Sequence, residues 1–365
     1  MAILSHRDLD DVRARLTSWL QVQLPKATGL AVSELVVPKG TGMSSETMLF
    51  DVTWNEGHTP HSGSYVARLA PEMDDWPIFP TYDLAMQAKV MRLVGGCTTL
   101  PVPKVPWLET DASVVGSPFL VMERAEGAAP SDNPPYVFGG WLTDGTSEQR
   151  RHLQDAAVRV LASIHAIDVS GHDVSFLDRR HHGPTPLDQH LNELHAYFTW
   201  AAGDDSFPLL ERVSTWLEQN RPTRTGPVVI SWGDSRIGNM LFKDFTPTAV
   251  LDWEMACLGH PEIDLGWMSF MHRMFQHYAE VFELPGLPDF MRMADLVETY
   301  EAASGTTLND LRYYEVLAGY RMACIFLRTS PLSIRAGMMQ EPATKEGYVT
   351  FSVLLEQMLD GTYWR

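Results

Sequence analysis

The sequence has few cysteines, no long hydrophobic run and no excess of positive charge, and each shortage excludes a class of protein. Its three cysteines, Cys97, Cys257 and Cys324, are far apart and odd in number. This pattern predicts neither a disulfide framework nor a zinc site, and it favours a reducing compartment. No stretch reaches the roughly 18 apolar residues of a membrane helix. The first residues, MAILSHRDLDDVRARL, lack the apolar core of a signal peptide, so we expect a cytoplasmic protein with no membrane partner.

The charge balance excludes another class of partner. Aspartate and glutamate together number 46 against 28 lysines and arginines, for a formal net charge of −18. Nucleic-acid-binding proteins neutralise phosphates with clustered basic residues, so we expect no nucleic-acid partner. The acidity is compatible with a cationic substrate without selecting one. The length of 365 residues allows two or three domains, and nothing in the sequence indicates an oligomeric state.

The stretch VVISWGDSRIGNMLFKDFTPTAVLDWE, residues 228–254, is the most informative part of the chain. Apolar runs at 228–230, 239–242 and 249–251 predict three short strands, and the last two flank the turn-forming sequence KDFTP. We therefore expect a strand, a loop and a small hairpin, in that order, with polar residues at the ends of the strands.

Three of those polar residues suit phosphoryl transfer. Asp234 and Asn239 are separated by four residues, and Asp252 follows the hairpin. The reaction needs a carboxylate that accepts a hydroxyl proton and oxygen ligands for Mg²⁺, and protein kinases carry Asp, Asn and Asp in this order. Each residue alone is more often structural, as a turn cap or at a strand end. Their joint order and spacing favour the kinase interpretation.

The phrases WGDSRIGN and LDWE resemble those of the aminoglycoside phosphotransferase family, which belongs to the kinase-like superfamily. The resemblance implies Asp234 as catalytic base, Asn239 and Asp252 as magnesium ligands, and ATP and Mg2+ as cofactors. Arg236 occupies the place where protein kinases carry a lysine, and we expect it to stabilise the transferring phosphate. The family's usual histidine before Gly-Asp is Trp232 here, which leaves open how the loop is braced.

A loop upstream could approach the nucleotide. The sequence KGTGMSSET lies between expected strands at 31–37 and 48–54. Glycine amides and hydroxyl groups in such a loop can contact a phosphate, so Gly42, Ser44 and Ser45 are the expected contacts. A plain hairpin turn explains the same residues, and only the position upstream of the Asp234 motif favours the nucleotide interpretation.

A third expected strand, 64–69, carries Arg68, which the resemblance implies would grip the α- and β-phosphates with its planar guanidinium. Kinase-like folds pair this basic residue with a glutamate from the next helix, expected here at 82–94. The matching position is Gln87, which can hydrogen-bond Arg68 but cannot neutralise it. A nearby acid, Asp74 or Asp75, is the alternative partner.

The phrase SPFLVMERAEG, at the end of expected strands at 104–109 and 117–123, resembles the family's adenine-binding hinge. We expect Met122 to lie behind the base and the backbone from Glu123 to Ala125 to bind the adenine edge. A buried strand that ends in a charged turn would give the same pattern without any ligand.

The rest of the chain is expected to be mostly helical. The phrase LASIHAIDV resembles one in which a histidine, here His165, packs behind the catalytic loop. LGHPEIDLGW resembles a run in which an aspartate, here Asp264, braces that loop by hydrogen bonds. Helices are expected at 8–23, at 147–167 with Ser147 as its cap, at 187–202, 207–220, 289–302, 309–328 and 344–358, and from Pro261 onward.

These features predict an α+β protein with the protein-kinase-like two-lobed fold. Residues 1–123 would form the nucleotide-binding lobe, with a small antiparallel sheet and an N-terminal helix, and residues 124–365 the helical catalytic and substrate-binding lobe. The expected function is ATP- and Mg2+-dependent phosphorylation of a small-molecule hydroxyl group. Members of the resembled family use aminoglycosides, other antibiotics, amino alcohols, sugars and hydroxyacyl thioesters, so the acceptor stays open.

Two alternatives remain. Trp232 and Gln87, at two positions where relatives differ, would also fit a nucleotide-binding protein with little turnover. A hydrolase using Asp234 and Asp252 ranks last, because the sequence has neither a G-x-S-x-G nor an H-E-x-x-H motif.

Overall fold

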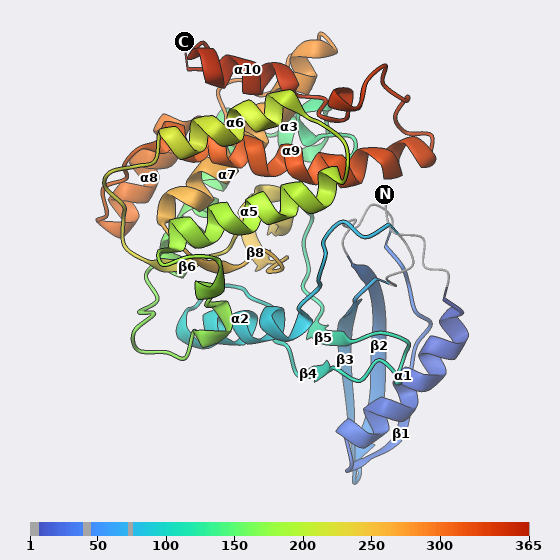
Figure 1. Ribbon diagram of the computed structural model, residues 1–365. Coiled ribbons are helices and arrows are strands. Elements are labelled where there is room, and N and C mark those ends of the chain that lie inside the picture. The colour runs from blue at the N-terminus through green and yellow to red at the C-terminus, as the bar shows by residue number, and fades with distance from the viewer. Residues whose placement is uncertain (1–6, 39–44, 72–75, 365) are drawn as a thin grey trace. The chain divides into compact units, whose positions relative to one another are not determined.

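The computed structural model describes residues 7–38, 45–71 and 76–364. The chain divides into two compact units (Figure 1). The first unit comprises residues 1–96 and 102–126, and the second comprises residues 97–101 and 127–365. Within the described ranges, no helix combines the length and the apolar character needed to cross a lipid bilayer.

The first unit is built on one antiparallel sheet. Its strands follow the order β1-β2-β3-β5-β4. Alternate residues of β2, including Met48, Phe50 and Val52, are buried, as the period of two in a strand requires. The bounds are β1 (Ala27–Val32), β2 (Glu46–Glu56), β3 (Thr59–Leu69), β4 (Trp107–Glu109) and β5 (Phe119–Glu123).

The first predicted strand, at 31–37, is wrong in position. β1 begins earlier, and Gly29, with φ of 61°, lies where its register with β2 shifts. Only glycine adopts this left-handed conformation at little cost. At the end of the predicted strand 31–37, Val36 forms only an isolated β-bridge with Leu49.

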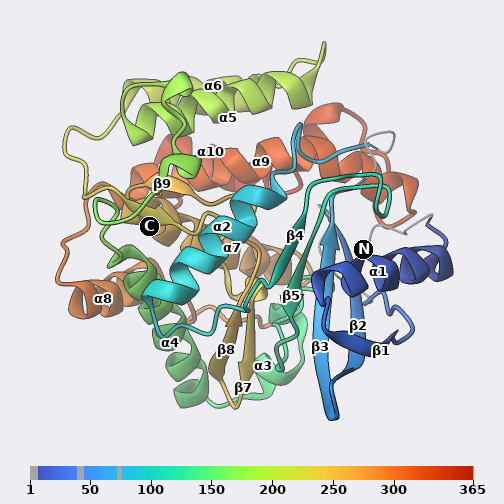
Figure 2. The ribbon, with the colours of Figure 1, turned by 90° about the horizontal axis from the view of Figure 1, so that it is seen from below.

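Among its described residues, the first unit contains two helices, α1 (Leu9–Gln23) and all but the last residue of α2 (Leu84–Cys97). The helical spacing predicted for α1 is confirmed, since Val12, Leu16, Trp19 and Leu20 are all buried. The Trp19 ring contacts Phe119 edge-on, with 4.8 Å between the ring centroids. α1 therefore packs against the sheet (Figure 2).

The second unit combines helices with two small sheets. β6 (Val229–Ser231) pairs with β9 (Cys257–Gly259), and β7 (Met240–Lys243) pairs with β8 (Thr246–Val250). The predicted strand, loop and hairpin are thus confirmed, whereas β9 was not predicted. The helices are α3 (Trp141–Asp144), α4 (Ser147–His165), α5 (Pro186–Ala202), α6 (Pro208–Gln219), α7 (Pro261–Val281), α8 (Met293–Ser304), α9 (Leu311–Arg335) and α10 (Ser352–Asp360).

Two details of the predicted helices are wrong. The cap of α4 is Thr146, not Ser147, because Thr146 and Gln149 form a reciprocal capping box. The helix predicted at 344–358 is broken into a 3₁₀ turn, Lys345–Tyr348, and α10. Gly347 and the β-branched pair Val349 and Thr350 have low helix propensity and lie at the break.

In the second unit, α7 packs closely against α9 (Figure 1). A Cβ atom on Gly266 of α7 would lie 2.7 Å from the backbone carbonyl group of Tyr314 in α9. Only glycine at this position lets the two backbones approach so closely.

We therefore predict that Gly266→Ala lowers the free energy of unfolding by about 1–3 kcal/mol, because the added methyl group overpacks the helix contact. The matched control is Gly96→Ala in α2, where an added Cβ would meet nothing within 4 Å. That variant should be as stable as the wild type or slightly more stable. Thermal unfolding of both variants checks this, and equal midpoints would contradict it.

Candidate active site

The loop that follows β6, residues 232–239, carries most of the predicted site and is called the Asp234 loop here. β6 is buried throughout, and the chain turns sharply at Gly233, where φ is 89°. A Cβ atom at Gly233 would lie 2.1 Å from the carbonyl oxygen of Met255. Glycine is therefore required both by the backbone angle and by the space available.

The Asp234 loop is held by the carboxylate of Asp264, in the first turn of α7. Oδ2 accepts the backbone N–H of Trp232 at 2.8 Å, and Oδ1 accepts that of Gly233 at 2.9 Å. Ser231 Oγ donates to Oδ1 at 3.0 Å, and Ser235 Oγ donates to the carbonyl oxygen of Asp264 at 2.8 Å. The predicted bracing role of Asp264 is confirmed.

His165, at the end of α4, holds the same carboxylate from the other side. Its Nε2 lies 2.9 Å from Asp264 Oδ2, and its Nδ1 lies 2.9 Å from the hydroxyl oxygen of Tyr300. A carboxylate only accepts, so Nε2 carries a proton and donates it to Asp264. His165 is thus structural, as predicted.

The buried Asp264 carboxylate is kept in its charged form by these donors. Burial raises the pKa of Asp264, but the hydrogen bond and charge of His165 and the backbone N–H groups of Gly233 and Trp232 outweigh it. The net result is a pKa below the usual value for aspartate. The bracing contact therefore depends on a charge in the core of the unit.

Trp232 supplies a brace that the sequence left open. The indole is fully buried, and its Nε1–H donates to the carbonyl oxygen of Leu251 at 2.9 Å and to that of Asp252 at 3.2 Å. The residue at the family's histidine position therefore ties the Asp234 loop to the segment that carries the second predicted metal ligand.

The Asp234 side chain is fixed by three donors. Trp267 Nε1 donates to Oδ1 at 2.7 Å, Asn239 Nδ2 donates to Oδ2 at 2.7 Å, and Arg236 Nε lies 3.1 Å from Oδ1. Three of the predicted site residues are thus brought together. The sequence reasoning missed Trp267, although it lies three residues after Asp264 and hence on the same side of α7.

Arg321 of α9 supports this arrangement and was also missed. Its Nη1 donates to the carbonyl oxygen of Gly233 at 3.1 Å, and its guanidinium lies 4.7 Å from the centroid of the Trp267 ring. Burial lowers the pKa of Arg321. No local motif marks this residue, since it lies more than eighty positions from the loop that it contacts.

The two predicted metal ligands suit a hard cation in chemistry. Because the amide nitrogen of Asn239 donates to both the side chain and the carbonyl oxygen of Asp234, the amide oxygen is the atom left for a metal. Leu251 N–H donates to the Asn239 carbonyl oxygen at 2.9 Å, so Asp252 follows a residue bonded to Asn239. Asp252 has φ of 58°. An amide oxygen and a carboxylate are oxygen donors of the kind that Mg²⁺ prefers, so these residues fit the ion.

Arg236 lies between two carboxylates. Its Nε contacts Asp234, and its Nη1 contacts Asp132 from the loop before α3. Burial lowers the pKa of Arg236, but the charges of Asp132, Asp234 and Asp252 more than offset it, so the pKa is raised above its usual value. Asp132 was missed because its loop, rich in glycine and proline, has no periodic pattern. The role of Arg236 toward a phosphate stays a prediction.

In the first unit, only part of the predicted phosphate-binding loop lies within the described residues. Gly42 and Ser44 lie outside the described residues, as do Asp74 and Asp75. Ser45 is buried, and its Oγ accepts hydrogen bonds from Arg68 Nε at 3.0 Å and Nη2 at 2.7 Å. Gln87, also buried, lies in α2 as expected.

The structure limits which backbone N–H groups the predicted hinge could offer to a base, and the prediction itself stays open. Met122 is buried in β5. The N–H of Glu123 donates to the Lys104 carbonyl oxygen at 2.8 Å, and that of Arg124 donates to the Ser64 carbonyl oxygen at 2.9 Å. Sheet contacts within the unit therefore occupy these two donors. In the part of the chain that the structure describes, the N–H of Ala125 is the hinge donor left for a base.

The chain matches the family model described as "Phosphotransferase enzyme family" over residues 55–312. The chain belongs to this family. Among curated proteins it is 28% identical over 302 residues to the "Probable acyl-CoA dehydrogenase IBR3" of Arabidopsis thaliana, and 27% identical over 281 residues to acyl-CoA dehydrogenase family member 11 of Rattus norvegicus. These matches cover 79% and 72% of this chain, but 35% and 33% of the relatives. The chain thus spans about a third of the length of these relatives.

Solved structures share the fold. A candidate aminoglycoside phosphotransferase of Ralstonia eutropha JMP134 has a TM-score of 0.64 at 21% identity, over 96% of this chain and 98% of that one. Macrolide 2'-phosphotransferase MphH of Brachybacterium faecium has a TM-score of 0.54 at 15% identity, over 94% and 97%. The predicted protein-kinase-like α+β fold of this phosphotransferase is confirmed.

We predict that Asp264→Asn lowers the free energy of unfolding by about 3–5 kcal/mol at neutral pH, because it removes a buried charge that four donors hold and sets an amide N–H group against one of them. A depressed folded-state pKa gives stability that is present above the ordinary value of 3.8 and is lost as the pH falls through the lower folded value. The difference between wild type and variant should therefore shrink below about pH 4.

Denaturant unfolding of both proteins across this pH range provides the measurement. Asp289→Asn is the control, since that side chain is 92% exposed, and it should behave as the wild type. A wild-type advantage that stays constant down to the lowest pH would contradict the assignment of a charged Asp264.

Proposed function

We propose that this phosphotransferase transfers the γ-phosphoryl group of ATP to a hydroxyl group of a small molecule, with Asp234 as the base. The observation that carries the proposal is the fixed Asp234 carboxylate, held by Trp267 and by Asn239, which is one of the predicted metal ligands. A turn-capping aspartate would not need a buried indole donor from a helix over thirty residues away.

In the proposed step, Asp234 accepts the hydroxyl proton while the hydroxyl oxygen bonds to the γ-phosphorus. The bond between that phosphorus and the bridging oxygen breaks, and ADP leaves. Such a reaction depends mainly on positioning and on charge stabilisation. Trp267 and Asn239 each hold one oxygen of Asp234, so its orientation is set before an acceptor binds.

The remaining predicted residues have supporting roles in this proposal. Asn239 would hold Mg²⁺ through its amide oxygen and Asp252 through its carboxylate. When bound, the ion would neutralise charge on the phosphate oxygens. In the first unit, Arg68 and Ser45 would contact phosphates and the Ala125 N–H the base. One structural relative is a GDP and kanamycin complex, with a TM-score of 0.55, which supports nucleotide binding by this fold.

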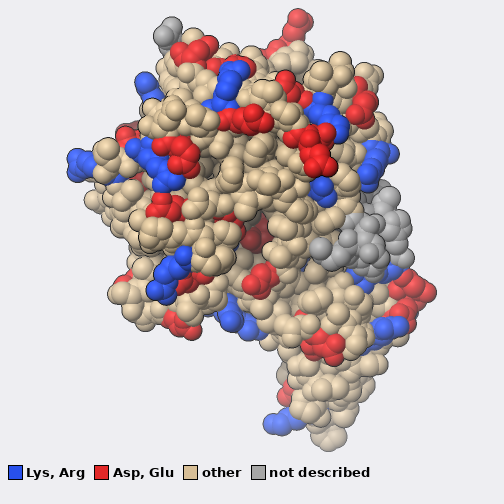
Figure 3. All heavy atoms as spheres, viewed as in Figure 1, with Lys and Arg blue, Asp and Glu red and all other residues tan. Residues whose placement is uncertain are grey.

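The names of relatives suggest two acceptor classes. The structural relatives are named for aminoglycosides and macrolides, but at identities that carry only the fold. The curated relatives, which are more similar in sequence, are named acyl-CoA dehydrogenases, which favours a hydroxylated acyl thioester as a second candidate. On the face shown in Figure 3, acidic and basic side chains are interspersed, so no single-sign patch there favours a polycation.

An acceptor screen that measures ADP release tests the function, with Asp252→Ala as the blank. We predict that Asp234→Asn lowers turnover on the best acceptor by about 10²–10⁴-fold, because the base acts in the transition state. Asp289→Asn, on an exposed side chain, serves as the control and should retain full turnover. Near-native turnover of Asp234→Asn would refute the assignment of the base.

A second variant separates an active enzyme from the alternative of a nucleotide-binding protein with little turnover. Trp232→His restores the family's usual residue, yet we predict that it lowers both turnover and stability, the latter by roughly 2–4 kcal/mol. The smaller ring leaves a cavity and loses the bond to one or both carbonyl groups of residues 251 and 252. A rise in turnover would instead show that Trp232 impairs catalysis.

A further inference from the structure

The two carboxylates beside Arg236 hold different nitrogens of its planar guanidinium. Nε donates to Asp234, at 3.1 Å from Oδ1 and 3.3 Å from Oδ2. Nη1 donates to Oδ2 of Asp132. The third nitrogen, Nη2, makes no hydrogen bond with any residue in the described part of the chain, and the side chain is 19% exposed. Nη2 is therefore the nitrogen that a phosphate oxygen can meet without displacing either carboxylate.

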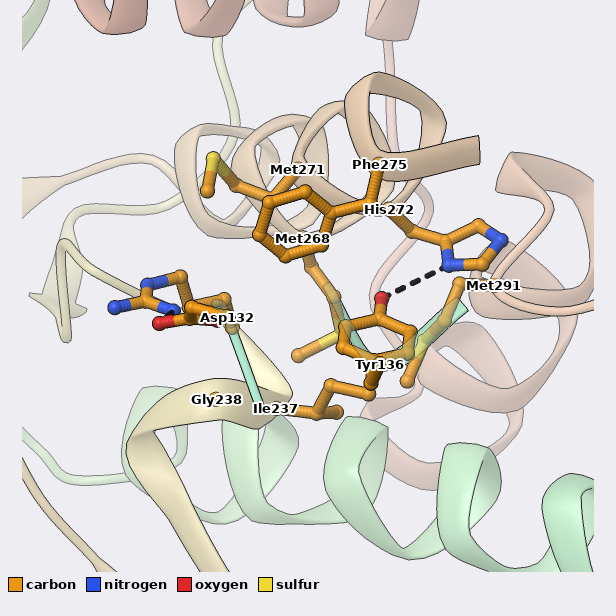
Figure 4. A pocket seen from close by; sticks show the side chains of 10 residues that line it. Asp132, Tyr136, Ile237, Gly238, Met268, Met271, His272, Phe275 and Met291 are labelled. Carbon is orange, nitrogen blue, oxygen red and sulfur yellow. Dashed lines mark hydrogen bonds and ion pairs between the residues drawn. The ribbon is translucent and has the colours of Figure 1, made fainter. Parts of the chain in front are cut away.

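Asp132 belongs to the segment before α3, and α7 anchors that segment. Asp132 forms an isolated β-bridge with Pro135, and the N–H of Tyr136 donates to the carbonyl oxygen of Ser131 at 2.7 Å. Tyr136 is buried, and its hydroxyl oxygen lies 2.9 Å from Nδ1 of His272 in α7 (Figure 4). The position of Nη1 is thus set by an element other than the loop that carries Arg236.

The Asp234 loop leaves room for this ion pair at Gly238. A Cβ atom there would lie 2.4 Å from Nη1 of Arg236 and 2.7 Å from Oδ1 of Asp132. Gly238 is not among the glycines with positive φ, so the backbone angle does not require glycine. A side chain at this position would occupy the space that the ion pair fills.

The ion pair is poorly suited to a purely stabilising role. The side chain of Asp132 is 42% exposed, and ion pairs near the surface contribute little to stability because water screens them. An arginine beside a single carboxylate tends to form a bidentate fork. Arg236 without Asp132 would turn Nη2 as well as Nε onto Asp234. Such a fork would occupy both the oxygens of the proposed base and the nitrogen available to a phosphate.

We propose that Asp132 is a positioning residue for phosphoryl transfer, which holds the guanidinium of Arg236 so that Nη2 stays available to the transferred phosphoryl group and Asp234 keeps an oxygen lone pair for the acceptor hydroxyl. This inference rests on the proposed function and adds a residue to it. In this role Asp132 acts through Arg236 and not on the substrates.

Turnover gives the first test. Asp132→Ala should lower kcat on the best acceptor by about 10–100-fold, the contribution of one charge-assisted hydrogen bond, and should leave KM for the acceptor unchanged. Asp132→Glu keeps a carboxylate and should recover part of the loss. Asp144→Ala, at an exposed acid of the same segment, is the matched control and should behave as the wild type. A wild-type kcat in Asp132→Ala would overturn the inference.

Nucleotide binding gives a readout in which the sign decides. Removal of a negative charge near a phosphate would by itself strengthen binding. Loss of the correct Arg236 orientation would weaken it. Calorimetry with Mg²⁺ should therefore show that Asp132→Ala binds a non-hydrolysable ATP analogue about 2–10-fold more weakly, whereas ADP, which lacks the γ-phosphate, binds as to the wild type. Stronger binding of the analogue would show that Asp132 only competes with the phosphate, and would overturn the inference.

A double-mutant cycle with Arg236→Met separates positioning from a structural role. In that background, Asp132→Ala should change neither kcat nor the thermal midpoint, and it should not weaken binding of the analogue. The same loss in both backgrounds would show that Asp132 only supports the fold of its segment, which contradicts the inference.

The two proposals fail in different ways. If the wild type releases ADP with no acceptor, the proposed function is refuted, and the cycle measured by analogue binding decides on Asp132. If the wild type turns over an acceptor and the cycle shows no coupling between Asp132 and Arg236, the function stands and the inference is overturned.

Discussion

The site depends on one buried charge. The carboxylate of Asp264 accepts from two consecutive backbone N–H groups, a serine hydroxyl and His165. A backbone turn as tight as the one at Gly233 leaves N–H groups that the loop itself cannot satisfy. A neutral acceptor would satisfy them less strongly, since hydrogen bonds to a charged group are roughly twice as strong. The charge in turn needs His165 and Tyr300, which explains why α4 and α8 converge behind the loop.

α7 connects the Asp264 carboxylate to other parts of the second unit. Asp264 holds the backbone of the Asp234 loop, and Trp267 holds the Asp234 side chain itself. Gly266, between them, lets α9 approach closely enough for Arg321 to reach both Gly233 and the Trp267 ring. One helix therefore fixes both the loop and the proposed base. The site is supported by a rigid element, which is what positional catalysis requires.

Site residues that lie close together in the sequence could be predicted from it. Residues that reach the site only through tertiary packing could not. Asp234, Asn239 and Asp252 lie close together in the sequence around a hairpin, and Asp264 lies within a recognisable phrase. Asp132 and Arg321 lie far from the loop in sequence and reach it only through the packing of a glycine- and proline-rich loop and of α9. Trp232 was recognised as a departure, but its two bonds could not be foreseen, because they depend on where β8 ends.

Negatively charged groups predominate around Arg236. Asp132, Asp234 and Asp252 all act on its guanidinium, so the carboxylates outnumber the positive groups around Arg236. A cluster of this kind is stabilised by a further cation, which accords with the oxygen donors of Asn239 and Asp252. A phosphate arriving with its ion would also compete with Asp132 and Asp234 for Arg236, since guanidinium pairs readily with either anion. In the proposed reaction, such competition would leave Trp267 and Asn239 as the donors that hold the Asp234 carboxylate.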